Sequence, residues 1–178
     1  ATFSDAVGAV TLTNGSIDGT TGVLTGTSYA MQNGSVSAIL AGAVNLTKTT
    51  AGTVTLSGVN TYTGITAINA GVLSVSTIGN GGVAGNMGAA TSTATNFVLG
   101  GGTLQYTGAT ASTNRNYVFT TGTTSTIELV TNDLTLTGAS TATTGGFTKI
   151  GNGTLILTGA NLHTGTTTVA DRTLEYGA

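Results

Sequence analysis

The sequence of 178 residues contains no cysteine, no proline and no tryptophan, and it has one histidine. Without cysteine the chain can form no disulfide and no thiolate metal site, and one histidine is too few for a zinc centre. We therefore expect no bound metal and no cofactor. The lack of thiols also suits a chain exported through an oxidising compartment, where stray thiols would cross-link.

Charged residues are scarce as well. The four Lys and Arg and the six Asp and Glu make up 6% of the chain, against about 25% in a typical domain. They are scattered and leave a net charge of −2, so we expect no nucleic-acid partner. No apolar run approaches the roughly 18 residues of a transmembrane helix. The opening residues, ATFSD, include no Met and no signal peptide, which indicates a processed or excised segment.

The chain is instead rich in threonine, in glycine and in short alternating runs of aliphatic residues. It has 29 glycines, and its mean hydropathy of +0.30 argues against a disordered low-complexity chain. Thr and Val are β-branched and favour extended backbone. Glycine interrupts every candidate helical window. The composition predicts an all-β fold.

An internal repeat dominates the sequence. Residues 48–75 (KTTAGTVTLSGVNTYTGITAINAGVLSV) align without gaps, at an offset of 101, with residues 149–176 (KIGNGTLILTGANLHTGTTTVADRTLEY). Residues 76–148 form a spacer, which holds partial copies such as GGTLQYTGA and NDLTLTGAS. Each copy predicts a strand of about five alternating residues, a Gly/Asn turn and a second short strand.

Such strands could form an antiparallel sandwich, a propeller or a parallel solenoid. The solenoid is favoured because like residues recur at matched positions, where successive coils would stack them into ladders. With about 20 residues per coil, residues 1–178 would form a single β-helix domain of about nine coils, just over 40 Å long. The repeat offset would then span about five coils.

The second copy follows the pattern K-x-G-x-G-T-L-x-L-[ST]-G-x-N-x-[YH]-T-G-x-T-x-[VI], and the first follows it nearly as well. This pattern resembles the autotransporter-associated β-strand repeat, also called the passenger-associated transport repeat. The resemblance implies a right-handed parallel β-helix (β-solenoid) exported to the bacterial surface. In that family the repeat is thought to assist folding and passage across the outer membrane. Such passengers commonly act as adhesins, biofilm factors or stalks.

Three departures from the family pattern stand out. The sequence contains no outer-membrane translocator. Asp171 and Arg172 replace Ala70 and Gly71 of the first copy, which predicts a different final turn. His163 replaces a tyrosine.

The candidates for catalysis are few. Glycoside hydrolysis needs two carboxylates in one cleft, and the acids are Asp5, Asp18, Glu128, Asp133, Asp171 and Glu175. The spacing of Glu128 and Asp133 puts them on opposite faces of a strand. Asp171 and Glu175 share a face, but Arg172 between them indicates an exposed turn with a local ion pair. No Gly-framed serine accompanies His163. We assign no catalytic residue and predict no enzymatic activity.

Candidates for binding are also weak. Lys48 and Lys149 precede their strands identically, and we interpret them as solubilising charges at the coil corners. His163 aligns with Tyr62, which indicates a ring position beside a turn. The tyrosines could stack against sugars, or they could pack in the core or at a sheet edge. The five tyrosines are Tyr29, Tyr62, Tyr106, Tyr117 and Tyr176. We leave the binding residues unassigned.

Together with the family resemblance, the sequence favours a structural extracellular rod of a bacterial cell-surface or secreted protein, which acts in adhesion or self-association or as a head-to-tail filament subunit. Both ends read as interior solenoid sequence without a polar cap, so we expect open ends that join neighbouring copies. Surface glycans or matrix are further partners to consider. The alternatives are an adhesin module with a specific carbohydrate or host ligand and a β-helix polysaccharide-degrading enzyme.

Overall fold

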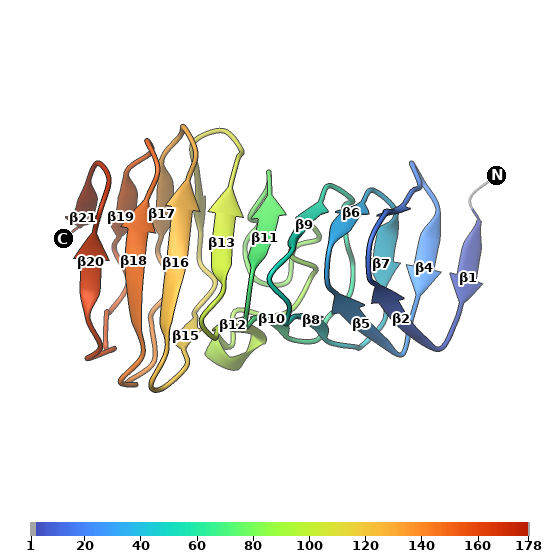
Figure 1. Cartoon of the computed structure of the whole chain (residues 1–178), viewed down its shortest axis with the longest axis horizontal. Helices are drawn as coiled ribbons and strands as arrows, with labels where there is room; N and C mark the ends of the chain where they lie inside the picture. Colours follow the sequence, from blue (N-terminus) through green and yellow to red (C-terminus); the bar gives the residue numbers. More distant parts are fainter. Residues whose placement is uncertain (1–2, 178) are drawn as a thin grey trace.

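The chain winds into a parallel β-helix. The computed structural model describes residues 3–177 and forms a β-solenoid of about nine turns, with the termini at opposite ends (Figure 1). Strands of one sheet rise across the front while the chain advances from right to left, so the coil is right-handed (Figure 1). The predicted fold class is confirmed. Within the described residues, the helical structure is limited to one 3-10 turn, η1 (Ala94–Asn96).

Four parallel sheets line the sides of the solenoid. The eight-stranded sheet consists of β3 (Ser16–Ile17), β6 (Gly34–Val36), β9 (Thr53–Leu56), β11 (Val72–Val75), β13 (Thr103–Tyr106), β16 (Thr124–Leu129), β18 (Gly146–Ile150) and β20 (Thr167–Val169). The six-stranded sheet consists of β2 (Ala9–Leu12), β5 (Ser28–Met31), β8 (Leu46–Lys48), β10 (Thr66–Ile68), β12 (Phe97–Leu99) and β15 (Val118–Phe119).

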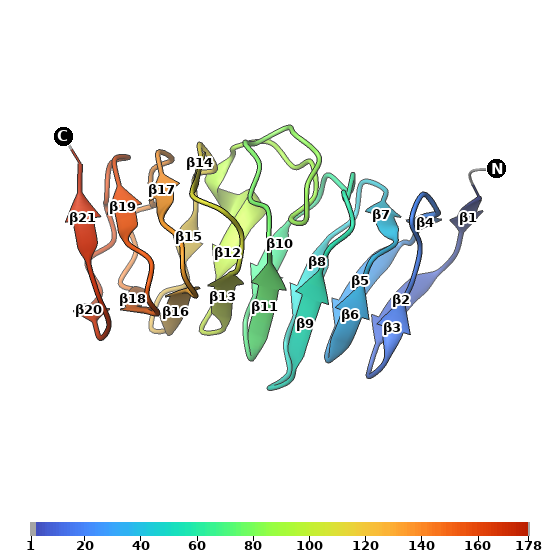
Figure 2. The same cartoon turned by 90° about the horizontal axis from the view of Figure 1, so that it is seen from above.

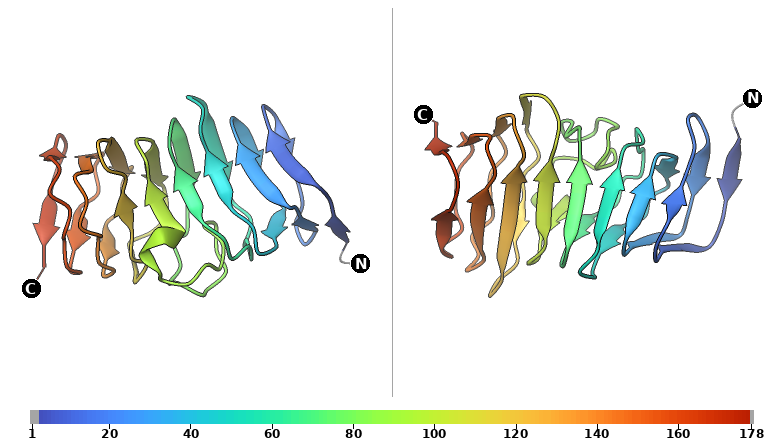
Figure 3. Two further views of the ribbon diagram at one scale, coloured as in Figure 1. Left: turned by 90° about the horizontal axis from the view of Figure 1, so that it is seen from below. Right: turned by 45° about the horizontal axis from the view of Figure 1, so that its top comes forward.

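The third side is divided between two sheets. In the N-terminal half it is the three-stranded sheet of β1 (Ser4–Ala6), β4 (Val23–Thr25) and β7 (Ile39–Ala41). In the C-terminal half it is the four-stranded sheet of β14 (Ala111–Thr113), β17 (Leu134–Leu136), β19 (Leu155–Leu157) and β21 (Leu174–Tyr176). The loop of residues 76–96 lies between these two sheets and bulges from the body, as Figures 2 and 3 show from two directions.

Inward-facing residues stack in rows along the axis. Alternation along each strand points every second side chain inward, and the parallel register places equivalent residues of successive coils side by side. One such row of the eight-stranded sheet is Val54, Leu73, Leu104, Ile127 and Lys149. The buried apolar residues form one continuous core cluster from Leu12 to Leu157.

Outward-facing residues stack as well, and on the eight-stranded sheet they are mostly hydroxyl residues. One outward row is Thr53, Val72, Thr103, Thr126, Thr148 and Thr168. The predicted stacking of like residues is therefore present here as a threonine ladder with one valine in it. Asparagines stack at a turn, where Asn33 donates to the side chain of Asn14 at 2.9 Å.

The two repeat copies occupy different sides of the solenoid. Strands β8 and β10 of the first copy lie in the six-stranded sheet, whereas their equivalents β18 and β20 lie in the eight-stranded sheet. Likewise, β9 and β11 lie in the eight-stranded sheet, and β19 and β21 in the four-stranded sheet. The second copy is thus turned one side further around the axis.

Unequal coil lengths explain this rotation. Lys48 is in register with Ile68, but Ile68 is in register with Leu99, because the coil between them includes the loop of residues 76–96. The prediction that the repeat offset spans about five equal coils was therefore wrong. The repeat unit fixes the local fold of a coil and leaves open the side on which the coil starts.

We expect Gly58→Ala to lower the free energy of unfolding by about 1–3 kcal/mol, the usual cost of overpacking. Gly58 lies against the backbone of the previous coil, where an added Cβ would overlap the carbonyl oxygen of Ala38. Urea unfolding followed by circular dichroism measures the change. Gly8→Ala is the matched control, because no atom lies within 4 Å of the added Cβ. An equal loss in both variants would contradict this packing of the coils.

Candidate functional site

Lys48 lies inside the solenoid. Its side chain is 0% exposed and stands in the inward row of the six-stranded sheet between Met31 and Ile68. The ammonium donates to the carbonyl oxygens of Thr50 and, at 3.2 Å, of Ala70, at the turns of two successive coils. The prediction of a solubilising corner charge was wrong, because the aliphatic stem fits the core row while the ammonium satisfies turn carbonyls.

Lys149 repeats this arrangement in the eight-stranded sheet, so the corner-charge prediction was wrong here too. The side chain is again 0% exposed. Its ammonium donates to the carbonyl oxygens of Gly151 at 2.8 Å and Asp171 at 3.1 Å, which occupy the positions of Thr50 and Ala70. Burial lowers the pKa of both lysines, and the carboxylate of Asp171 partly opposes this at Lys149. Each lysine ties the corner of one coil to the next.

Arg115 is a third buried cation, and it holds the protruding loop. The residue is 2% exposed, and its guanidinium donates to four carbonyl oxygens of the loop. These are Gly79 at 2.9 Å, Ala90 at 3.2 Å, Gly88 at 2.7 Å and Val83 at 3.5 Å. The loop has no regular partner strand here, so the guanidinium takes the place of a backbone ladder.

Asn86 fixes the same loop from within. Its Oδ1 accepts from the backbone N–H groups of Ser76 and Thr77, each at 2.9 Å, and its Nδ2 donates to the carbonyl of Gly58 at 3.0 Å. Sequence reasoning missed both Arg115 and Asn86. The glycine-rich stretch signalled a loop, but no pattern indicated which distant side chains would organise it.

The acids considered as catalytic pairs serve separate backbone and surface contacts. Glu128 points outward from β16 and accepts from the side-chain amide of Gln105 at 2.9 Å. Asp133 lies in the turn before β17 and accepts from the N–H of Thr154 at 2.6 Å. Glu175 lies in β21, on the four-stranded sheet.

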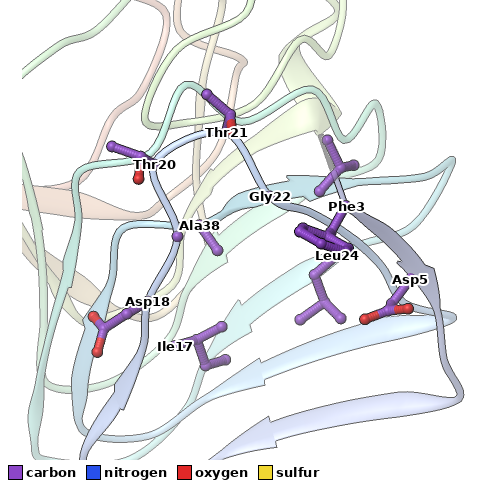
Figure 4. Close-up of a pocket in the computed structure, with 11 residues that line it drawn as sticks. Phe3, Asp5, Ile17, Asp18, Thr20, Thr21, Gly22, Leu24 and Ala38 are labelled. Carbon is purple, nitrogen blue, oxygen red and sulfur yellow. The ribbon is translucent and has the colours of Figure 1, made fainter. Parts of the chain in front are cut away.

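A pocket of about 410 Å³ lies beside the first coils, lined by β1, β4 and the turn between β3 and β4. Asp5 and Asp18 stand at its two sides, with the aliphatic side chains of Ile17 and Leu24 between them (Figure 4). The hydroxyl of Ser16 donates to Asp18 at 2.5 Å. The structure thus brings to one pocket two acids that no sequence pattern paired.

Four of the five tyrosines belong to the core. Their exposed fractions are 2% or less, and they are Tyr29, Tyr62, Tyr106 and Tyr117. Tyr176 is 59% exposed. For these four tyrosines the structure shows core packing, one of the two kinds of packing weighed against the stacking of sugars. Within residues 3–177, a surface cluster of tyrosines, which would favour a specific carbohydrate ligand, is not formed.

His163 takes the ring position that Tyr62 takes in the first repeat, as predicted. The hydroxyl of Tyr62 lies 2.7 Å from Thr66 Oγ1, and Nε2 of His163 lies 3.1 Å from Thr167 Oγ1. The imidazole packs edge-on against Phe119, with the ring centres 5.0 Å apart.

The final turn keeps the backbone conformation of the first repeat. Arg172 has φ 56° and Gly71 has φ 63°, so the prediction of a different turn was wrong. The prediction of a local ion pair at this turn was wrong as well. Asp171 accepts from the N–H of Gly151 at 3.3 Å, and Arg172 donates its Nε–H to the carbonyl of Asn152 at 3.1 Å. These contacts with the previous coil hold a non-glycine residue in the left-handed region.

The described residues offer no group of three or more His, Asp or Glu side chains that could hold a metal ion. In the same part of the chain, no helix is long and apolar enough to cross a membrane.

We expect Arg115→Met to loosen residues 79–90, because it leaves buried carbonyls unpaired at a cost of about 1–3 kcal/mol each. Hydrogen–deuterium exchange should accelerate in that loop and stay near the wild-type rate in β16 and β18. Arg172→Met, at an exposed turn, is the matched control and should leave the loop protected. Unchanged exchange of residues 79–90 in Arg115→Met would show that the loop does not depend on the guanidinium.

Comparison with known proteins supports the repeat pattern. The family model for the passenger-associated transport repeat matches residues 46–75 and 147–174. The chain is 42% identical over 121 residues to the adhesin BmaC autotransporter of Brucella suis biovar 1 (strain 1330). That alignment covers 67% of this chain and 4% of the adhesin, so the chain spans a small part of this relative. No solved structure matches the chain.

The first matched segment spans the four strands β8 to β11, and the second runs from β18 to the start of β21. Each segment carries a buried lysine at the same position of the repeat. The chain therefore carries two repeats of the passenger-associated transport repeat family.

Proposed function

We propose that this chain is a rod segment of an extracellular adhesin at a bacterial cell surface, with a structural rather than a catalytic role. The observation that carries the proposal is the 42% identity to an autotransporter adhesin along a β-helix. The relative's name speaks only for that protein, and its extension to this chain is our inference.

The surface chemistry supports a rod that presents a uniform face. The outward rows of the eight-stranded sheet carry hydroxyl side chains on successive coils, including Thr103, Thr126 and Thr148. Regularly spaced hydroxyl groups suit many weak polar contacts with glycans or matrix. The acids are dispersed or separated by aliphatic side chains, which does not favour the paired chemistry of a polysaccharide-degrading enzyme.

Surface display tests this function. We expect a non-adherent bacterium that displays residues 1–178 on an autotransporter translocator to attach to matrix-coated surfaces more than cells with the translocator alone. The double variant Thr126→Lys/Thr148→Lys should reduce attachment, because it interrupts the hydroxyl row. Thr47→Lys, on the outward side of the six-stranded sheet, is the matched control.

Protease access to an N-terminal tag on intact cells reports that each variant is displayed. Attachment equal to the translocator control, with the tag accessible, would contradict an adhesive role for this segment. Attachment lost equally in the Thr47→Lys control would contradict the choice of face.

We further propose that the chain self-associates through the edges of its end coils. Strands β20 and β21 each pair on one side only. Around them Leu162, Val169 and Tyr176 are 53%, 45% and 59% exposed. Phe3, at the opposite end, is 75% exposed. Unpaired strand edges flanked by apolar side chains favour the addition of another strand, and a second copy offers matching coils.

Sedimentation velocity tests the self-association. We expect the average mass of the wild-type chain to rise with concentration, and more steeply at high salt, because both end coils carry excess acid. Val169→Lys/Tyr176→Lys should stay monomeric, since lysines at an edge oppose strand addition. Val59→Lys changes a valine that is 59% exposed and lies away from the edges, and it should behave as wild type. A wild-type chain that stays monomeric at all concentrations would contradict the proposal.

A further inference from the structure

The imidazole of His163 joins three successive layers of the C-terminal part of the solenoid. Its Nδ1 lies 3.2 Å from Ser140 Oγ in the coil below, and its Nε2 lies 3.1 Å from Thr167 Oγ1 of β20. Ser140 itself pairs with Tyr117 one coil earlier. The ring therefore connects the last coil to the coils that precede it.

The hydrogen bonds at Ser140 fix the tautomer of the imidazole. Ser140 Oγ accepts from the backbone N–H groups of Leu162 at 2.8 Å and His163 at 3.3 Å. With both acceptor positions used, the hydroxyl can only donate its hydrogen to Nδ1. The network thus assigns a neutral imidazole that accepts at Nδ1 and donates from Nε2 to Thr167.

The side chains that contact the ring carry no negative charge that could pair with a protonated imidazole. Phe119 of β15 and Phe147 of β18 pack edge-on against it, with ring centres 5.0 and 5.5 Å away. The titratable groups near these elements point to other partners, since Tyr117 donates to Asn161. The ammonium of Lys149 on β18 likewise donates to turn carbonyls. Strand β20 carries no titratable residue.

We propose that His163 is an acid-sensitive latch that holds the coil of β20 and β21 on the solenoid at neutral pH and releases it as the pH falls. Protonation turns Nδ1 into a donor that faces Ser140 Oγ, whose acceptor positions are already used. The latch makes the attachment of this coil to the rod depend on pH. This property does not depend on what the rod binds.

The direction of the pH effect follows from linkage. Burial lowers the pKa of His163 below its ordinary value of 6.5. The opened coil therefore binds more protons than the closed coil between the lowered pKa and 6.5, and the closed state loses stability as the pH falls through this window. Above about pH 6.5 both states are neutral at this residue and the latch is closed.

Hydrogen–deuterium exchange of residues 167–176 tests the latch, after correction for the intrinsic effect of pH. Between about pH 7.5 and about pH 5, protection in the wild-type chain should fall by up to about tenfold per pH unit of the window. His163→Tyr is the matched control, because it installs the residue that the first repeat carries at Tyr62. In this variant the protection of the last coil should not change with pH.

An NMR titration of His163 in the wild-type chain decides the case even if the tyrosine variant fails to fold. A pKa well below 6.5 is expected, and Ser140→Ala should raise it by removing the hydrogen bond to the neutral ring. A pKa at or above 6.5 would overturn the proposal. Equal acid sensitivity in the wild type and His163→Tyr would overturn it as well, and would attribute the effect to Asp171 and Glu175 in the last coil.

Discussion

The structure depends on the parallel hydrogen-bond ladder between successive coils. Most strands inside the stack pair with the strand above and the strand below, so most of the backbone is satisfied without help from side chains. A chain with few charges and many threonines can therefore fold, because its side chains need only fill the narrow interior and leave the turns clear. The other features of the molecule satisfy backbone groups where this ladder is interrupted.

The ladder is interrupted at the corners of the coils and at the loop of residues 76–96. There the carbonyl groups have no strand partner, and the chain supplies buried cations in place of one. Lys48 and Lys149 serve the corners of the two repeats, and Arg115 serves the loop. Burying an ammonium or a guanidinium is favourable only when its donors are used, and each of these cations donates to two or more carbonyl oxygens. Few charges remain for the surface, which is therefore uniform and rich in hydroxyl groups.

A uniform surface suits a function that is distributed along a rod. The proposed roles in adhesion and self-association draw on repeated outward rows and on strand edges, and not on a cluster of reactive groups. His163 stands apart from this pattern. It substitutes a titratable ring for a tyrosine within an aromatic stack, and so gives one coil a dependence on pH that the equivalent coil of the first repeat lacks.

The sequence by itself determined the all-β class, the parallel solenoid, the number of coils and the ring position of His163. These follow from alternation, from Gly/Asn turns and from like residues at matched positions, all of which are local and repetitive. Tertiary structure decided the rest. The side on which each repeat lies depends on the lengths of all intervening coils, so the loop rotated the second copy. The burial of Lys48 and Lys149 depends on carbonyls one coil away, and the shared turn of Gly71 and Arg172 depends on contacts with the coil before it. The sequence of a single repeat does not show which residues of the adjacent coils contact it. In a stacked fold these contacts determine which side chains are buried.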